Sequence, residues 1–199
     1  MKAVSKNRLI IVISSPSGAG KTSVCQKILE RDKSIGLSIS DTTRPARNNE
    51  INGIDYNFIE VSEFKQKIES NSYIEYANVF GNYYGSPHKN ITDHFENNRD
   101  ILFDIDWQGA LQLRKSTFPN IVSIFIIPPS KDVIFERLKL RAKTSGDNLE
   151  AINNRMKEYE TEMNHKDDYD YVVVNQEFEI CVNEIERIIN KSRNKLLIN

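Results

Sequence analysis

Residues Ser15–Thr22 read SPSGAGKT, a loop of small residues that ends in a lysine and a threonine. The apolar run Leu9–Ile13 precedes this loop, and the helix-compatible stretch Ser23–Leu29 follows it. In a strand–loop–helix setting, successive backbone N–H groups converge on an anion and the helix N-terminus adds partial positive charge. We therefore predict a phosphate-binding loop in which Lys21 contacts the outer phosphates and Thr22 ligates Mg²⁺.

One position of this loop departs from the phosphate-loop pattern GxxxxGK[ST]. The pattern begins with glycine, whereas this chain has Ser15, so the turn must form without a freely positive φ. Pro16 fixes its own φ at the next position. The alternative is a small-residue turn with a chance lysine, which the flanking strand and helix disfavour. The residues expected to contact the phosphates of a nucleotide such as ATP are Ser15, Pro16, Ser17, Gly18, Ala19, Gly20, Lys21 and Thr22.

A second group of polar residues lies in the run Ser40–Arg47, which reads SDTTRPAR. Arg44 and Arg47 flank a proline at a spacing that lets both guanidinium groups face one phosphate. Tyr56 and Tyr84 could add hydroxyl donors. A solvated surface is the alternative for isolated arginines, but two of them beside Ser-Asp-Thr-Thr favour a function.

The remaining sequence predicts an α/β fold built on a parallel sheet. Strands are expected where the apolar character is continuous rather than alternating, because parallel strands are covered on both faces by helices. Helical stretches fill the gaps between these strands. The predicted strands are 9–13, 100–106, 121–127 and 171–175, and the predicted helices after the first are 108–117, 130–141, 149–166 and 177–197.

About fifty residues, from Ser38 to His88, separate the first helix from the second core strand, which is too long for a simple connection. This stretch contains short aromatic strands at 55–59 and 73–77 and a helix at 62–70, so we predict a small mixed α/β insert. The polar, glycine-containing segment Lys143–Asn148 predicts a mobile, loop-like lid.

Composition sets mild limits. With 199 residues, 39% of them hydrophobic, the chain can bury a core, and its net charge of −1 does not favour nucleic acid or an anionic membrane as a partner. No secretory segment or membrane-spanning run is visible, which predicts a cytoplasmic protein. Cys25 and Cys181 are far apart and have no CxxC spacing, which disfavours a zinc site or a disulfide framework.

Several short motifs together resemble the guanylate kinase family. These are SPSGAGKT, SDTTRPAR, NNEINGIDYNF, YIEYA, GNYYGSP and LFDIDWQGA, in one order over about Leu9 to Asn175. The resemblance implies a phosphate-loop NTPase core, a GMP-binding insert and a short lid within a single domain, 1–199. The expected boundaries are about 1–38, 89–140 and 157–199 for the core, 39–88 for the insert and 141–156 for the lid.

The resemblance also implies reversible transfer of the ATP γ-phosphoryl group to GMP, giving ADP and GDP, with Mg²⁺ as cofactor and dGMP as a further acceptor. It places Ser40 and Glu75 at the guanine, and Glu75 would accept from N1–H and the 2-amino group. Residues expected at the GMP phosphate or at neighbouring substrate positions are Arg44, Arg47, Glu50, Tyr56, Tyr84, Ser86, Asp104 and Asp106.

Asp104 and Asp106, at the acidic end of a strand, could hold the Mg²⁺ shell or accept a substrate hydrogen bond, and the sequence does not separate the two roles. Lid and lid-flanking arginines that would close on the transferring phosphoryl group are Arg137, Arg141 and Arg155, while Asn175 matches a position near the ATP base. The segment between Arg141 and Arg155 is a few residues longer than the usual family lid.

Two alternatives to a guanylate kinase remain open. A non-catalytic binding module could keep the fold and use the GMP face for a peptide, although Lys21, Thr22 and the phosphate arginines favour catalysis. A related kinase could act on another phosphorylated acceptor, although Ser40 and Glu75 disfavour this. The resemblance is compatible with a monomer or a homo-oligomer.

Overall fold

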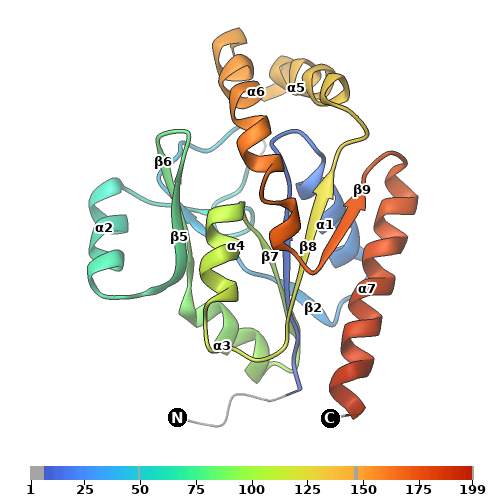
Figure 1. Cartoon of the computed structure of the whole chain (residues 1–199). Helices are drawn as coiled ribbons and strands as arrows, with labels where there is room; N and C mark the ends of the chain where they lie inside the picture. The colour runs from blue at the N-terminus through green and yellow to red at the C-terminus, as the bar shows by residue number, and fades with distance from the viewer. Residues whose placement is uncertain (1–6, 49, 146–147, 199) are drawn as a thin grey trace.

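The computed structural model describes residues 7–48, 50–145 and 148–198, apart from the side chains of Arg141 and of residues 143–145. The larger of its two sheets has five strands in the order β2-β7-β1-β8-β9, and all of them are parallel. Figure 1 shows this sheet at the centre of the molecule with helices on both faces. The α/β class and the parallel sheet are therefore confirmed. Its strands are β1 (Ile10–Ser14), β2 (Ile35–Leu37), β7 (Asp100–Asp104), β8 (Ile121–Ile127) and β9 (Tyr171–Val174).

Strand β1 has no exposed residue because it contacts helices on both sides. Ile11 and Ile13 face a core cluster that includes residues of α1 (Lys21–Arg31) and α7 (Phe178–Ile198), whereas Ile10 and Val12 face α3 (His88–Glu96) and α4 (Trp107–Arg114). This two-sided burial is the physical reason for the continuous apolar run in the sequence.

A second sheet of four strands, in the order β4-β3-β6-β5, lies beside the first (Figure 1). It has one parallel pair, β3 with β4, and two antiparallel pairs. Phe64 of the adjacent helix is fully buried and stacks on the ring of Tyr73 at a centroid distance of 4.6 Å. The elements are β3 (Asp41–Thr42), β4 (Asn57–Phe58), α2 (Val61–Glu69), β5 (Tyr73–Val79) and β6 (Asn82–Pro87).

Helices α5 (Lys131–Ser145) and α6 (Leu149–Met163) pack on each other at the top of the view in Figure 1. Their contact is a small cluster of its own, formed by Ile134 and Leu138 with Ile152 and Tyr159. The expected loop at 143–148 is wrong for residues 143–145, which continue α5, while residues 146–147 lie outside the described part of the chain.

Several elements were not expected from the sequence. Strand β2 has only three residues, and β3 only two, so neither produces a clear apolar pattern. Helix α3 buries only Ile91 and Phe95. The strand predicted at 100–106 ends at Asp104 because Asp106 begins the next helix. Among the described residues, no helix is long and apolar enough to cross a membrane.

Asp41 holds the second sheet together through a buried carboxylate. The side chain is 1% exposed, and its oxygens accept hydrogen bonds from Asn57 Nδ2 at 2.8 Å, Lys67 Nζ at 2.9 Å and Tyr73 Oη at 2.8 Å. Strands β3, β4 and β5 and helix α2 thus share one acceptor. Because Ser40 and Thr42 flank this residue, the network also positions the run that leads to Arg44.

We expect Asp41→Ala to lower the free energy of unfolding by about 3 kcal/mol, because it leaves buried donors without an acceptor. Urea unfolding measures this. Glu63→Ala is the matched control, since Glu63 bonds the same Lys67 from the surface at 3.2 Å. Equal stability of the two variants would show that the buried network does not hold the sheet together.

Candidate functional site

The phosphate loop connects the end of β1 to the start of α1, as predicted. Gly18 and Gly20 adopt φ values of 89° and 94°, a region that favours glycine, and Gly20 is also the residue before the first turn of α1. Ser15 does not have a positive φ. The glycine missing from the first position of the pattern therefore causes no backbone strain here.

Lys21 and Thr22, at the start of α1, both contact Asp104 at the end of β7. Lys21 Nζ forms an ion pair with Oδ1, and Thr22 Oγ1 donates to Oδ2 at 3.1 Å. Strands β1 and β7 are neighbours with Ile13 opposite Asp104, which brings this carboxylate next to the loop. Burial alone would lower the pKa of Lys21, but the adjacent Asp104 carboxylate raises that pKa above its usual range.

Asp106 has a different local role from Asp104. Its Oδ1 accepts from Gly109 N at 3.0 Å, which caps the N-terminus of α4, and its Oδ2 accepts from Gln108 Nε2 at 3.0 Å. The structure thus separates the two acids of the LFDID run by their contacts, which the sequence does not.

Two predicted site residues hold the phosphate loop through hydrogen bonds to the Ala19 carbonyl oxygen. Asn175 Nδ2 donates to this oxygen at 2.7 Å, and Arg137 Nη1 donates to it at 3.2 Å. Arg137 Nη2 also donates to the Asn175 carbonyl at 3.3 Å. Asn175 is 3% exposed, so this group is part of the rigid frame of the loop.

Arg44 and Arg47 do converge, and Glu50 lies between them. Arg44 makes a bidentate pair with the Glu50 carboxylate at 2.8 and 2.9 Å, and Arg47 bonds it through its backbone N–H at 2.8 Å. Arg44 Nε also donates to Tyr84 Oη at 3.2 Å. Burial alone would raise the pKa of Glu50, but the hydrogen bonds from Arg44 lower it.

Tyr56 packs against the arginine cluster. Its ring lies 5.5 Å from the Arg44 guanidinium and packs edge-on against Tyr84 at 5.9 Å. Burial, followed by the charge of Asp104, raises the pKa of Tyr56 to about 12, while Lys21 acts in the opposite direction. The hydroxyl therefore remains a proton donor at neutral pH.

Glu75, Ser40 and Ser86 form a buried polar group on the second sheet. Glu75 is 2% exposed and lies opposite Ser86 in the β5–β6 pair, and the hydroxyls of Ser40 and Ser86 share a hydrogen bond at 3.0 Å. Glu75 Oε1 is buried and has no hydrogen-bond partner among the described residues. Burial raises the pKa of Glu75 to about 7, with the Ser86 hydroxyl lowering it and Asp106 raising it. Such an acceptor calls for a donor from a ligand.

Of the two other arginines predicted at the site, on α5 and α6, the structure brings one to the loop. Arg155 Nη1 donates to Ser17 Oγ at 3.1 Å, while the side chain of Arg141 lies outside the described residues. Glu162, which the sequence analysis does not single out, accepts from Ser17 N at 3.0 Å. It is one of many charged residues on α6, and its partner is 145 residues away. No pattern in a single sequence could have identified it.

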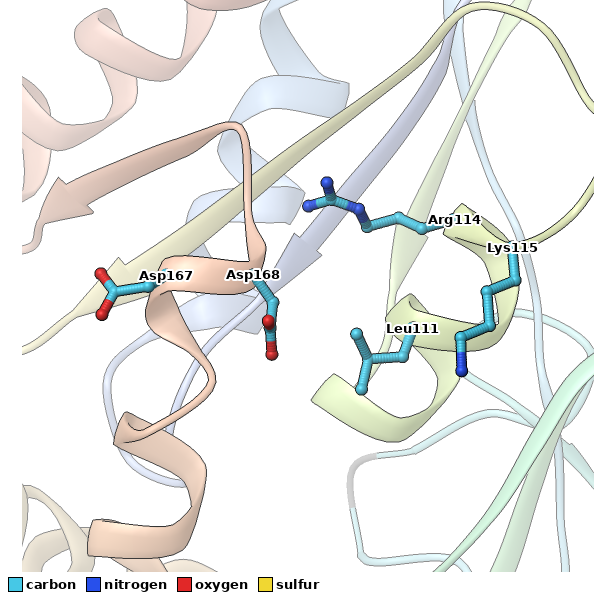
Figure 2. A pocket seen from close by; sticks show the side chains of 5 residues that line it. All are labelled: Leu111, Arg114, Lys115, Asp167 and Asp168. Carbon is cyan, nitrogen blue, oxygen red and sulfur yellow. The ribbon is translucent and has the colours of Figure 1, made fainter.

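A surface hollow between α4 and the short helix η1 (Lys166–Asp168) is separate from this site. Figure 2 shows Arg114 and Lys115 on one side of it and Asp167 and Asp168 on the other. Arg114 is already used by Ser123 Oγ at 3.1 Å and by Asp170 at 3.8 Å. None of the predicted site residues lines this hollow.

Comparison with known proteins was made with this geometry in hand. The family model described as guanylate kinase matches residues 6–192. The guanylate kinase of Rickettsia felis is 44% identical over 96% of this chain and 97% of its own, and that of Novosphingobium aromaticivorans is 42% identical over 96% and 85%.

Solved structures give the same result. The crystal structure of guanylate kinase from Anaplasma phagocytophilum has a TM-score of 0.76 and 36% identity, covering 96% of this chain and 88% of that one. The SH3-kinase fragment of tight junction protein 3 has a TM-score of 0.52 at 10% identity, covering 94% and 58%, and so shares the fold alone. This chain belongs to the guanylate kinase family.

Proposed function

We propose that this chain transfers the γ-phosphoryl group of ATP to GMP, reversibly, giving ADP and GDP. The observation that carries the proposal is that a phosphate loop and a buried carboxylate, Glu75, face one site. Glu75 Oε2 lies directly against Gly109 at the start of α4, and Gly109 N donates to Asp106, which lies two residues after the Asp104 that pairs with Lys21 of the loop. A phosphate-binding end and a base-reading end are thus close enough to serve two nucleotides in one reaction.

Glu75 and the two serines fit guanine. An ionised carboxylate satisfies the adjacent N1–H and 2-amino donors of guanine together, and adenine has no such pair on that edge. Glu75 Oε1, buried without a partner in the described chain, is an acceptor of this kind. Ser40 and Ser86 add hydroxyls beside it. Because these groups read the base and not the sugar, we expect dGMP to be accepted as well.

Arg44 and Arg47 fit the phosphate of GMP, with hydroxyls from Tyr56 and Tyr84. The two arginines are oriented by one carboxylate, Glu50, and a phosphate with roughly twice its charge competes well for the same donors. When GMP binds, the two arginines would exchange the Glu50 carboxylate for the phosphate and keep their side-chain orientation. Glu50 therefore acts in this proposal as the residue that aligns them.

The loop 15–22 would bind the ATP phosphates through Lys21 and backbone N–H groups, although Pro16 has no N–H and that of Ser17 is held by Glu162. Arg137 and Asn175, which hold the Ala19 carbonyl, keep this loop in shape, and Arg155 lies at its Ser17 end. We propose that Arg137, Arg141 and Arg155 neutralise charge on the transferring group. Phosphoryl transfer needs mainly positioning and electrostatic stabilisation, so no general base is required.

The oxygens of Thr22 and Asp104 fit Mg²⁺, a hard cation that is usually held by one or two protein oxygens together with phosphates and water. Among the described residues there is no group of three or more His, Cys, Asp or Glu that could hold a metal. Bound Mg²⁺ would neutralise charge on the ATP phosphates. Asp104 would hold it, directly or through water, while Asp106 caps α4.

The proposed partners are the two nucleotides, with no role for nucleic acid or membrane. The net charge of −1 supports this, because the cationic groups are local to the site. The reaction would recycle GMP in purine metabolism, and since both substrates are cytoplasmic metabolites we place it in the cytoplasm.

The purified protein should form ADP from ATP and Mg²⁺ with GMP or dGMP, but not with AMP, CMP or UMP. Lys21→Ala should lower this rate by about 10³-fold or more, because the loop loses the charge that contacts the outer phosphates. Lys27→Ala, an ion-paired lysine on the same helix, is the matched control and should behave like the wild type. Binding of GMP without any turnover would favour a non-catalytic module.

Glu75→Gln should weaken GMP binding by about 10- to 100-fold and leave ATP binding within about twofold, because only the base-reading carboxylate is changed. In the wild type, GMP affinity should fall as pH drops through about 7, since protonated Glu75 no longer accepts both donors. Calorimetric titration between pH 6 and 8 measures this.

The GMP phosphate titrates in the same range in both proteins, so the wild-type dependence is read relative to that of Glu75→Gln. Exposed Glu69→Gln on α2 serves as the control. Equal weakening of both nucleotides, or the same pH dependence with and without Glu75, would count against a role in reading guanine.

A further inference from the structure

Glu162 contacts the phosphate loop from the C-terminal end of α6. It is in the last turn of α6, is partly buried, and its Oε2 accepts from Ser17 N at 3.0 Å. Ser17 is the third residue of the loop, next to Gly18 with its φ of 89°. A backbone N–H of the phosphate loop is thus bonded to a carboxylate of the chain itself.

Arg155 contacts the same loop residue from the same face of α6. It precedes Glu162 by seven residues, close to two helical turns, and its Nη1 donates to Ser17 Oγ at 3.1 Å. One helix therefore contacts Ser17 twice, through a carboxylate on the backbone N–H and a guanidinium on the side chain. The Arg155 guanidinium also lies 5.3 Å from the ring of Phe80, at the β5–β6 turn.

The C-terminal end of α6 is attached to the core close to Glu162. The ring of His165 stacks on Trp107 at 3.7 Å with an interplanar angle of 8°, and Trp107 is the first residue of α4, directly after Asp106. This stack orients the C-terminal end of α6, while the Glu162–Ser17 hydrogen bond sets the distance between α6 and the phosphate loop.

Two charged residues of the site, Asp106 and Lys21, act on Glu162, as does Glu158 of its own helix. Burial raises the pKa of Glu162 to about 7, the Ser17 N–H lowers it, Asp106 raises it, Lys21 lowers it and Glu158 raises it. Burial and the nearby Asp106 make the ionised carboxylate costly unless a donor holds it, and Ser17 N is such a donor.

We propose that Glu162 is a positioning residue for phosphoryl transfer. Its carboxylate fixes the Ser17 end of the phosphate loop relative to α6 and so places Arg155 at the transferring phosphoryl group. An error of about 1 Å in a group that stabilises a transition state can cost about 10²-fold in rate, so a fixed register between helix and loop matters. This inference rests on the proposed function and deepens it.

A double-mutant cycle on the full chain tests the proposal. The variants are Glu162→Ala, Glu162→Gln, Arg155→Ala and the double variant Arg155→Ala with Glu162→Ala. Glu158→Ala is the matched control, an exposed carboxylate one turn earlier on α6. The measurements are kcat and the KM values for ATP and GMP, with thermal unfolding to confirm that each variant is folded.

Glu162→Ala should lower kcat by about 10-fold or more while KM for GMP stays within about twofold. Glu162→Gln should recover most of this loss, because its amide oxygen can accept from Ser17 N. The double variant should be no slower than Arg155→Ala alone, since both changes remove the same effect.

Three results would each overturn the proposal: a rate for Glu162→Ala equal to that of Glu158→Ala, multiplying losses in the double variant, or no recovery with Glu162→Gln. A general loosening of the fold would instead raise KM for GMP and lower the unfolding temperature. If the wild type and Glu158→Ala both failed to phosphorylate GMP, the proposed function itself would fail, which is a distinct outcome.

Discussion

The site depends on charge compensation within the chain. Two of the cations that we propose bind phosphates, Lys21 and Arg44, each lie beside a carboxylate that stabilises their charge in a partly buried place. Lys21 is paired with Asp104, and Arg44 with Glu50. These acids keep the cations ionised and oriented, so phosphates can enter by exchanging one anionic partner for another. Lys21 and Arg44 are therefore already oriented before a substrate binds.

The register of the parallel sheet provides the Lys21–Asp104 pairing. Because β1 and β7 are neighbours with Ile13 opposite Asp104, the acid at the end of one strand lies beside the loop that leaves the other. On its other side, β1 pairs with β8, and β8 pairs with β9. β9 ends just before Asn175, the residue whose side chain holds the Ala19 carbonyl. The second sheet is held by Asp41 and carries Glu75 and Ser86 on adjacent strands. Asp104, Glu75 and Ser86 thus lie within strands, and Asn175 directly follows one, so the sheets fix their places.

Much of the fold and part of the site could be predicted from the sequence, wherever a short stretch of residues carries a clear pattern. The core strands are continuous apolar runs, and the phosphate loop has a distinctive spacing. The short strand β2 and helix α3 lack such patterns, since α3 buries only Ile91 and Phe95. The distinct contacts of Asp104 and Asp106, and the contact of Glu162 with Ser17, depend on residues that meet only in the folded chain. Local sequence propensities do not encode contacts between residues that are distant in the sequence.

Arg155 touches both the phosphate loop, at Ser17, and the β5–β6 turn of the second sheet, at Phe80. A side chain shared by two binding regions links their equilibria. If the contact is favoured when either nucleotide is bound, each nucleotide must tighten the other, and by thermodynamic necessity the two enhancements are equal. Cooperativity between donor and acceptor would then follow from one guanidinium, without any change in the residues that touch either base.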